Sequence, residues 1–385
     1  MKQKNLHVRV YSFLATLLTP LVKYKFNYFY NDLSKEKGPY LVLSNHNLDL
    51  DAFLVGAAFK THMYYVASEH IFRQGIWSRL LVKLFDPIPR IKGKTGTNTP
   101  SEIIKRLQNG HNVCMFAEGD RSFHGRTMPI RPSTGTLVKK AKATIITFRL
   151  KGGYFTQPRW GHGLRRGRME GQLVSKYSPE QLSGMSIDEI NTAIRNDLFE
   201  DAYESQKKKK IPFKGKNLAL GLETFLFICP ECHGCSTMKS SGNHLTCTCG
   251  LSLNYTEYGH LAGNRKTFKT ISEWDKWQTD HLSSQLTTDE KSVFFYENDI
   301  KLLKITDHKV IEKYSGILSG DTQHFTCCDK EFIINKITNM AIYSRNSIII
   351  IYDSQHYEIK GPQSFCAWKY LLLYRLLNNK TATLT

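Results

Sequence analysis

No uncharged apolar run near the start of the sequence is long enough to cross a membrane. The stretch Val10–Val22 is interrupted by Pro20 and falls short of the ~20 apolar residues that a spanning helix needs. No small-residue cleavage site follows it, so we expect no secretory signal. Its basic flanks and tyrosines favour an in-plane helix that anchors residues 1–30 at a membrane interface, although a first core helix of a soluble domain fits the same pattern.

Acidic residues are also scarce, but only in one part of the chain. Residues 1–228 contain 36 Lys and Arg against 18 Asp and Glu, whereas residues 229–385 contain 17 against 16. The formal net charge of +19 therefore lies almost entirely in the first part. This excess indicates an anionic partner, which could be nucleic acid, a membrane surface or a phosphorylated substrate.

Cysteine is rare outside one short segment. Five of the nine cysteines lie between Cys229 and Cys249, which favours a metal site in a reducing compartment over a disulfide framework. Cys229-x2-Cys232 and Cys247-x-Cys249 are two close pairs joined by a polar loop. This arrangement resembles a zinc ribbon over residues 216–265, with four thiolates around one structural zinc ion.

The second cysteine pair is one residue shorter than the usual Cys-x2-Cys. Cys235, His233 or His244 could therefore replace one of the four ligands. A thiol redox pair and a set of unrelated buried cysteines are the two alternatives. No surplus of acidic residues surrounds the cluster, so the pattern indicates a structural rather than a catalytic metal.

Within an expected domain at 31–215, residues 31 to about 170 alternate between short apolar strands and helical segments. Strands are expected at 38–46, 63–68, 112–119 and 144–153, and helices at 51–60, 78–85, 100–110 and 134–143. Residues 171–210 are polar and look helical throughout. The alternation predicts an α/β fold with a mixed, largely parallel sheet and flanking helices. In such sheets functional residues gather at the carboxyl ends of the strands.

The stretch "LSNHNLDLDAF" follows the first of these strands. It contains His46 in a loop and Asp51 at the expected start of a helix, where Asp is a favoured N-cap. A carboxylate on one ring nitrogen of His46 would leave the other nitrogen as a general base. The pair could also be a plain helix cap beside a loop histidine. Asp49-x-Asp51 could alternatively be a metal-binding DxD pair.

The stretch "FAEGDRS" follows the strand at 112–116. Gly119 lets the backbone turn there, and Arg121 offers a guanidinium fork for an oxyanion such as phosphate. Glu118 could orient that arginine or bind a hydroxyl group. Arg90 follows two prolines in "DPIPRIKG" and supplies a second cation. Each stretch alone is also compatible with an ordinary surface turn.

The order of these motifs resembles that of the PlsC-like glycerolipid acyltransferases, the lysophosphatidic acid acyltransferase family. The resemblance covers roughly residues 30–170. The matching residues are Asn45, His46, Asp51, Arg90, Phe116, Glu118, Gly119, Arg121 and Ser122. Ala117 and Asp120 stand where the family commonly has Pro and Thr, so Asp120 adds a negative charge beside the expected phosphate site.

The resemblance implies an O-acyltransferase that makes phosphatidic acid from 1-acyl-sn-glycerol-3-phosphate. It implies His46 as the general base, Asp51 as the residue that orients it, and acyl-CoA or acyl carrier protein as the thioester donor, without a catalytic cofactor. The residues implied to bind substrate are Asn45, Arg90, Glu118, Gly119, Arg121 and Ser122. Another lysophospholipid is the alternative acceptor. A phospholipid membrane is the expected partner, and the cytoplasmic face of that membrane the expected location.

Residues 290–385 read differently again. Short β-rich runs at 292–297, 331–336, 347–353 and 356–361 precede an amphipathic helix at 364–379. This pattern loosely resembles a pleckstrin-homology-like (PH-like) domain, without any residue motif. A basic zinc-ribbon protein that binds nucleic acid is the competing hypothesis. The near-neutral charge of residues 229–385 speaks against it, so we expect no nucleic-acid partner.

Overall fold

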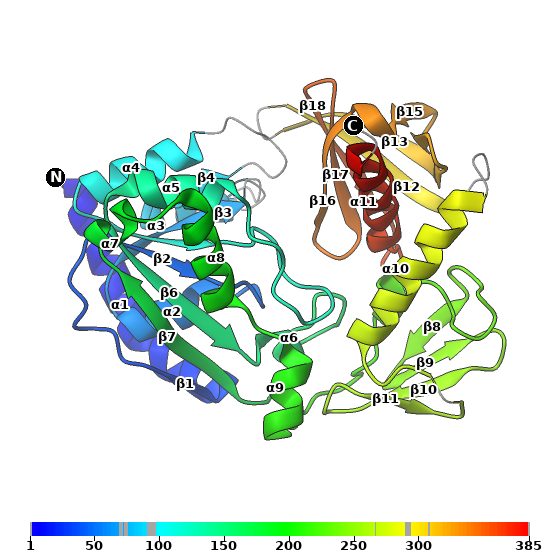
Figure 1. The fold of residues 1–385 in the computed structure, drawn as a ribbon, viewed down its shortest axis with the longest axis horizontal. Helices are drawn as coiled ribbons and strands as arrows, with labels where there is room; N and C mark the ends of the chain where they lie inside the picture. Colours follow the sequence, from blue (N-terminus) through cyan, green and yellow to red (C-terminus); the bar gives the residue numbers. More distant parts are fainter. Residues whose placement is uncertain are drawn as a thin grey trace.

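The computed structural model of the protein describes residues 2–68, 72, 76–90, 98–265, 267–288, 294–306 and 309–383. These residues form three β-sheets with helices around them (Figure 1). The first sheet lies in the N-terminal part, and the two others follow each other in the C-terminal part.

The first sheet has seven strands in the order β1-β7-β6-β2-β5-β3-β4. They are β1 (Tyr28–Tyr30), β2 (Tyr40–Ser44), β3 (Met63–Ser68), β4 (Ile88–Arg90), β5 (Asn112–Phe116), β6 (Thr144–Lys151) and β7 (Met169–Tyr177). Every neighbouring pair is parallel except β6 and β7. This confirms the expected α/β architecture with a largely parallel sheet.

Helices cover both faces of this sheet, so its central strands are apolar on both sides. Tyr40 and Val42 of β2 belong to one core, and the alternate residues Leu41 and Leu43 belong to the other. The helices are α1 (Lys2–Phe26), α2 (Asp51–Phe59), α3 (Ile76–Phe85), α4 (Thr99–Gln108), α5 (Ser133–Ala141), α6 (Gly153–Thr156), α7 (Pro179–Ser183), α8 (Ile187–Leu198) and α9 (Ala202–Lys209). Residues of α2 pack in the first core, and residues of α4, α5 and α8 pack in the second.

One local expectation for this region is wrong. Residues 171–177 belong to strand β7 rather than to a helix, because β7 pairs with β6 over most of its length. Pro20 lies inside α1, which continues to Phe26. Residues 28–30 of the expected anchoring segment form β1, which pairs with β7 at the edge of the sheet.

The second sheet is small and antiparallel, in the order β11-β10-β9-β8. Its strands are β8 (Met238–Ser241), β9 (His244–Cys247), β10 (Ser252–Tyr255) and β11 (Leu261–Gly263). A short 3-10 helix, η2 (Leu222–Thr224), precedes it, and α10 (Ile271–Thr288) follows it. We call residues 216–265 the cysteine module.

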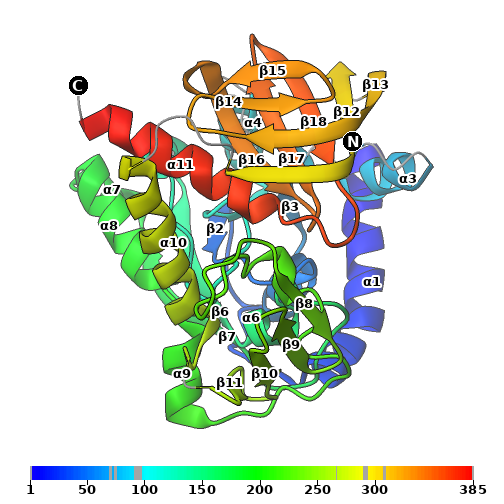
Figure 2. The same ribbon diagram turned by 90° about the vertical axis from the view of Figure 1, so that its right-hand side faces the viewer.

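The third sheet is antiparallel and has seven strands in the order β15-β14-β13-β12-β18-β17-β16 (Figure 2). Its elements are β12 (Phe295–Thr306), β13 (Lys309–Gly320), β14 (His324–Cys327), β15 (Lys330–Ile333), η3 (Ile334–Lys336), β16 (Ile337–Tyr343), β17 (Ser347–Tyr352), β18 (Gln355–Lys360) and α11 (Ala367–Thr383). We call β12–β18 with α11 the C-terminal module. Residues 292 and 293, at the start of the first expected strand, lie outside the described residues.

The two C-terminal sheets share one apolar core with residues of the N-terminal part, Phe123 among them. Trp368 of α11 lies against Phe123, with ring centroids 4.9 Å apart, and also against Phe225. The indole N–H of Trp274 in α10 donates to the carbonyl of Ile228 in the cysteine module. The loop after β5 is therefore in van der Waals contact with the C-terminal module.

Candidate active site

The loop between β2 and α2 places His46 at the carboxyl end of strand β2, in the first sheet. Asn45 anchors this loop to β6: its side-chain amide donates to the carbonyl of Leu150 at 2.8 Å and accepts the Leu150 N–H at 2.7 Å. Phe116, the last residue of the neighbouring strand β5, stacks on the His46 imidazole with centroids 4.6 Å apart. The position of His46 is thus set by both strands that flank β2.

Asp51 holds the imidazole from the other side. Its Oδ2 lies 2.8 Å from His46 Nδ1 and also accepts the backbone N–H groups of Asn47 and Leu48. An ionised carboxylate only accepts hydrogen bonds, so a neutral His46 carries its proton on Nδ1 and keeps the lone pair on Nε2. Asp51 is fully buried, while 24% of the His46 side chain is exposed.

The helix-capping interpretation of Asp51 is wrong in detail. Asp51 is the first residue of α2, and Leu50 occupies the N-cap position without a side-chain hydrogen bond. The Asp51 carboxylate reaches back to the loop instead of forward to the helix. Asp49 faces elsewhere: its Oδ1 lies 3.3 Å from Arg121 Nη1, and its Oδ2 accepts a hydrogen bond from Gln157. The two carboxylates thus have separate partners rather than a shared site.

Glu118 connects the loop after β5 to the loop of His46. Its Oε1 accepts the His46 backbone N–H at 2.6 Å, and its Oε2 accepts the N–H of Met128. The side chain is buried, and this burial raises the pKa of Glu118 well above its usual range although the two N–H groups lower it. In this arrangement Glu118 sets the spacing between two loops.

Arg90 lies directly over Gly119. Gly119 has φ +68°, and a Cβ there would stand 2.2 Å from Arg90 Nη1, so the turn admits the guanidinium only with glycine. Burial lowers the pKa of Arg90 to about 10, helped by the charge of Arg131. The side chain is therefore still a cation at neutral pH.

Arg121 leaves the same turn and points into the site. Its Nη1 donates to Gln157 Oε1 at 3.3 Å and is paired with Asp49. Burial lowers the pKa of Arg121, and the charge of Asp49 opposes that shift. The next residue, Ser122, is buried and its Oγ accepts the N–H of Gly125, which closes the turn.

These side chains border a cavity of about 1200 Å³. His46, Arg90, Gly119 and Arg121 form its polar end together with residues from later in the chain. Leu14, Leu18 and Val22 of α1, Phe53 of α2 and Met63 of β3 belong to its apolar wall. The cavity thus joins an imidazole, two cations and an apolar wall.

All of the motif residues fall in one stretch that matches a known family. Residues 26–151 match the family model described as Acyltransferase. Residues 26–151 are an acyltransferase domain. A search of solved structures gives the 1-acyl-sn-glycerophosphate (LPA) acyltransferase PlsC from Thermotoga maritima, at 15% identity and a TM-score of 0.42, over 49% of this chain and 78% of that chain. No curated protein matches the chain.

The acyltransferase domain brings the expected site residues together but gives them unequal access to the cavity. His46, Arg90, Gly119 and Arg121 line it. The remaining expected residues are at most 6% exposed and brace the loops: Asn45, Asp51, Glu118 and Ser122. The expected substrate site therefore divides into side chains that face the cavity and side chains that hold those in place.

Sequence patterns did not reveal Arg159, which organises the polar end of the cavity. It lies just after the acyltransferase domain, is 4% exposed, and its Nη1 pairs with Asp120 at 2.6 Å and donates to the carbonyl of Arg121. Asp120, the residue that departs from the common family motif, is thereby compensated. No motif surrounds Arg159 in the sequence, and its role depends on contacts between distant segments.

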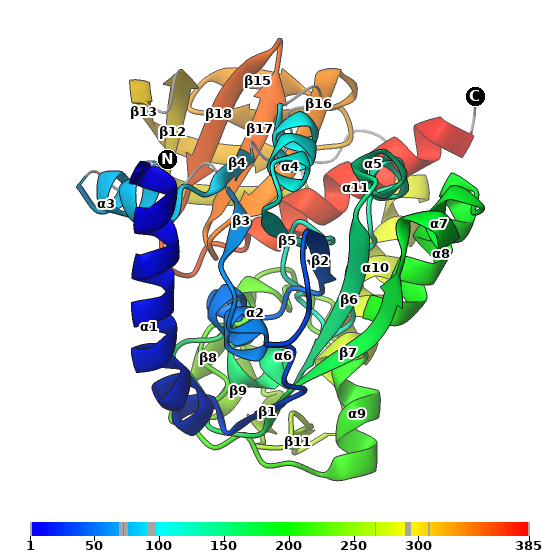
Figure 3. The same ribbon diagram turned by 90° about the vertical axis from the view of Figure 1, so that its left-hand side faces the viewer.

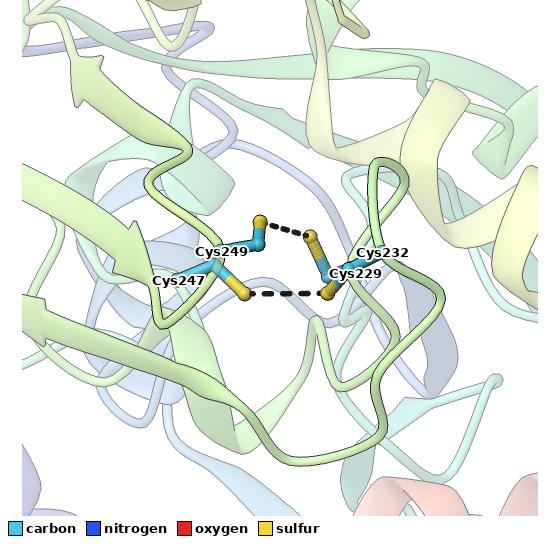
Figure 4. A group of neighbouring side chains, drawn as sticks. All are labelled: Cys229, Cys232, Cys247 and Cys249. Atoms are coloured by element: carbon cyan, nitrogen blue, oxygen red, sulfur yellow. Dashed lines mark hydrogen bonds between the residues drawn. The ribbon is translucent and has the colours of Figure 1, made fainter.

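The four cysteines of the cysteine module face one another (Figure 4). Their Sγ atoms all lie within 4.8 Å, with Cys229 and Cys249 at 3.8 Å and Cys232 and Cys247 at 3.7 Å. A tetrahedron with Zn–S bonds of ~2.3 Å has S···S edges of roughly 3.8 Å, so the donor set fits zinc. Cys235 is exposed and bonds Ser236, outside this group. Among the described residues, these four are the one set of three or more metal-ligating side chains.

Proposed function

We propose that the protein transfers an acyl group from a thioester to the free hydroxyl of 1-acyl-sn-glycerol-3-phosphate, which gives phosphatidic acid. The observation that carries this proposal is the His46–Asp51 pair at the polar end of a cavity that also holds Arg90 and Arg121. A base beside two guanidinium groups suits an acceptor that presents a hydroxyl near a phosphate. The match of residues 26–151 to the acyltransferase family supports the reaction class.

The proposed chemistry uses only proton transfer and positioning. The Nε2 of His46 takes the proton of the acceptor hydroxyl as its oxygen attacks the thioester carbonyl. The tetrahedral intermediate then collapses, the C–S bond breaks, and the thiolate of CoA or of acyl carrier protein leaves and takes up a proton. Asp51 keeps the imidazole in the required tautomer and stabilises the positive charge that forms on it.

The acceptor is assigned from the charge of the site. Guanidinium groups bind phosphate through paired hydrogen bonds; Arg90 lies over Gly119, and Arg121 donates to Gln157. We assign Asn45, Glu118, Gly119 and Ser122 to the support of these groups. The apolar wall from α1 would take the acyl chain of a substrate. Another lysophospholipid with a phosphate next to its glycerol would fit the same description.

Arg121→Lys is expected to raise the KM for the lysophospholipid acceptor by roughly 10-fold, because lysine loses the second hydrogen bond of a bidentate contact. The kcat with saturating acceptor should change less. Initial rates with varied acceptor concentration measure this split. Arg195→Lys, on the exposed surface of α8, is the matched control. An unchanged acceptor KM in Arg121→Lys would remove the phosphate role.

Contact with a membrane is proposed for the outer face of α1, which runs along the outside of the protein next to α2 and α3 (Figure 3). Phe13, Leu17, Leu21 and Tyr24 recur every three or four residues and are 55–72% exposed. Ile76 of α3 adds to this apolar surface with 71% exposure. Within the described residues, no helix is long and apolar enough to cross a membrane.

A double change Leu17→Asp and Leu21→Asp is expected to weaken binding to phospholipid vesicles by roughly 10- to 100-fold, because two leucine side chains no longer enter the apolar layer. Sedimentation with anionic and neutral vesicles measures the binding. The matched control is Ile187→Asp with Phe199→Asp, two exposed apolar residues at the ends of α8. Equal loss in both double variants would contradict a specific membrane face on α1.

The two remaining modules are proposed as a structural zinc ribbon and a PH-like module. The four neighbouring thiols, together with the small antiparallel sheet of this module, support the first. The seven-stranded antiparallel sheet with a terminal helix supports the second. The proposed boundaries stay at 1–30 for the anchoring segment, 31–215 for the acyltransferase unit, 216–265 for the ribbon and 290–385 for the PH-like unit.

The proposed function is tested by acyl transfer with purified protein on vesicles. A panel of lysophospholipids is combined with oleoyl-CoA and oleoyl-acyl carrier protein, and products are separated by head group. The highest kcat/KM is expected with 1-acyl-sn-glycerol-3-phosphate as acceptor. Exclusive use of a different lysophospholipid would correct the acceptor, and absence of transfer with every pair would contradict the proposed reaction.

A further inference from the structure

The C-terminal module contributes to the wall of the cavity. Residues 343–346, at the end of β16 and in the turn to β17, and residues 360–363, at the end of β18 and beyond it, line the same cavity as His46 and Arg121. The β16–β17 hairpin lies on the side of the C-terminal module that faces the acyltransferase domain (Figure 1). A substrate in this cavity would therefore touch residues that are about 300 positions beyond His46 in the sequence.

Arg159 fixes the hairpin against the catalytic loop. Its Nη2 donates to the carbonyl of Ile342, at the end of β16, at 2.8 Å. Its Nη1 holds Asp120 and the carbonyl of Arg121, and its guanidinium lies 4.0 Å from the centre of the Phe123 ring. Because one buried side chain bonds both segments, the turn after β16 has a defined place beside Arg121.

Arg345 is the central cation of this turn. Its Nη1 lies 2.8 Å from His162 Nδ1. Burial and the charge of Arg345 lower the pKa of His162, so the imidazole is neutral and accepts the hydrogen bond. Among the described residues no carboxylate is within ion-pair distance of Arg345. In the described part of the chain, the guanidinium lies in the cavity wall without a carboxylate partner.

The charges around the cavity are strongly unbalanced. Its lining includes five cationic side chains, Arg90, Arg121, Arg159, Arg345 and Lys360. Among the described lining residues, two carry carboxylates, Asp49 and Asp120. Asp120 is bound to the buried Arg159, whereas the Asp49 side chain is 66% exposed and has Arg121 and Gln157 as its partners. Asp49 acts electrostatically on both Arg121 and Arg345, so an anion that replaced its carboxylate would feel both guanidinium groups.

We propose that Arg345 of the C-terminal module binds a phosphate group of a substrate, together with Arg121 and in place of the Asp49 carboxylate. Lys360 adds a more exposed positive charge at the same end of the cavity. This inference rests on the proposed acyl transfer, and it makes the C-terminal module part of the substrate site. The phosphate belongs either to the lysophospholipid acceptor or to the CoA donor, and the experiment separates these two sources.

The kinetic part compares Arg345→Gln in the full chain with the unchanged protein. Loss of a charge-assisted hydrogen bond is expected to raise the KM of the substrate that supplies the phosphate by roughly 10- to 100-fold. Two phosphate-free analogues serve as controls: a monoacylglycerol in place of the acceptor and an N-acetylcysteamine thioester in place of the CoA donor. If the acceptor supplies the phosphate, Arg345→Gln should leave the KM of the monoacylglycerol unchanged. If the donor supplies it, Arg345→Gln should leave the KM of the N-acetylcysteamine thioester unchanged. A merely structural role for Arg345 would impair all of these substrates alike and overturn the proposal.

The binding part does not depend on turnover. Titration calorimetry with 1-oleoyl lysophosphatidic acid and, separately, with coenzyme A is done on the unchanged protein, Arg345→Gln, Arg345→Lys and His46→Ala. For one of the two ligands, the dissociation constant should be roughly 10- to 100-fold higher with Arg345→Gln than with the unchanged protein. Arg345→Lys should give an intermediate value, and His46→Ala should give the value of the unchanged protein. Arg195→Gln on α8 is the control. Unchanged binding of both ligands to Arg345→Gln, or no binding to the unchanged protein, would overturn the proposal, whereas binding without acyl transfer would overturn only the proposed function.

Discussion

Replacing His46 with alanine is expected to lower the rate of acyl transfer by roughly 10²- to 10⁴-fold, the usual contribution of a positioned general base. The loss should appear in kcat, because the Nε2 lone pair acts on the hydroxyl during the chemical step. The KM values should change much less, since the cavity keeps Arg90 and Arg121. Initial-rate kinetics on vesicles with both substrates varied measure the two effects separately.

Two controls make the His46 result decisive. His244→Ala changes an exposed histidine on β9, outside the cavity and outside the cysteine cluster, and should keep normal turnover. Circular dichroism and thermal melting should show that His46→Ala is folded, because this side chain is partly exposed and its removal leaves no sealed void. Normal acyl transfer by a folded His46→Ala protein would rule out His46 as the base.

Removal of zinc is expected to have the largest effect on stability. Structural zinc contributes roughly 10–16 kcal/mol of apparent binding free energy in zinc-finger peptides, and that energy is folding energy. The cysteine module shares its apolar core with α10 and the C-terminal module, so its loss should unfold more than residues 216–265. A chelator or Cys232→Ser should lower the melting temperature and release about one zinc per chain. Metal analysis together with calorimetric melting checks both.

Cys232 and Cys235 offer a matched pair for this test. Both are exposed, so replacing either thiol with a hydroxyl opens no cavity. Only Cys232 belongs to the four-sulfur group. Cys235→Ser should therefore keep its zinc and its melting temperature. Equal behaviour of the two variants, or a stable metal-free protein, would contradict a structural zinc site.

The motif residues could be predicted from the sequence because each depends on local chain geometry. His46 and Asp51 follow a strand and begin a helix, so their contact is set within one loop. Cys229 and Cys232 likewise need only a tight turn. The same holds for Gly119, whose φ of +68° favours glycine. In these places, residue type and spacing along the chain are enough to explain why the side chains meet or the backbone turns.

The other features depend on segments that meet only after folding. Arg159 and Arg345 reach the cavity through contacts across 183 residues, which no local pattern records. Strand β7 looks polar and helical in the sequence because it lies near an edge of the sheet and only its first residues are buried. Glu118 looks like a group for substrate, and its two backbone partners become visible only in three dimensions.

Helix α1 has two apolar sides with different surroundings. Leu14, Leu18 and Val22 border the cavity, while Phe13 and Leu17 point outward. With its outer side in lipid, α1 would separate the bilayer from the cavity by the thickness of a single helix. A lysophospholipid could then slide sideways into the site without passing through water. Its rate of conversion would follow its mole fraction in the membrane surface rather than its concentration in bulk solution.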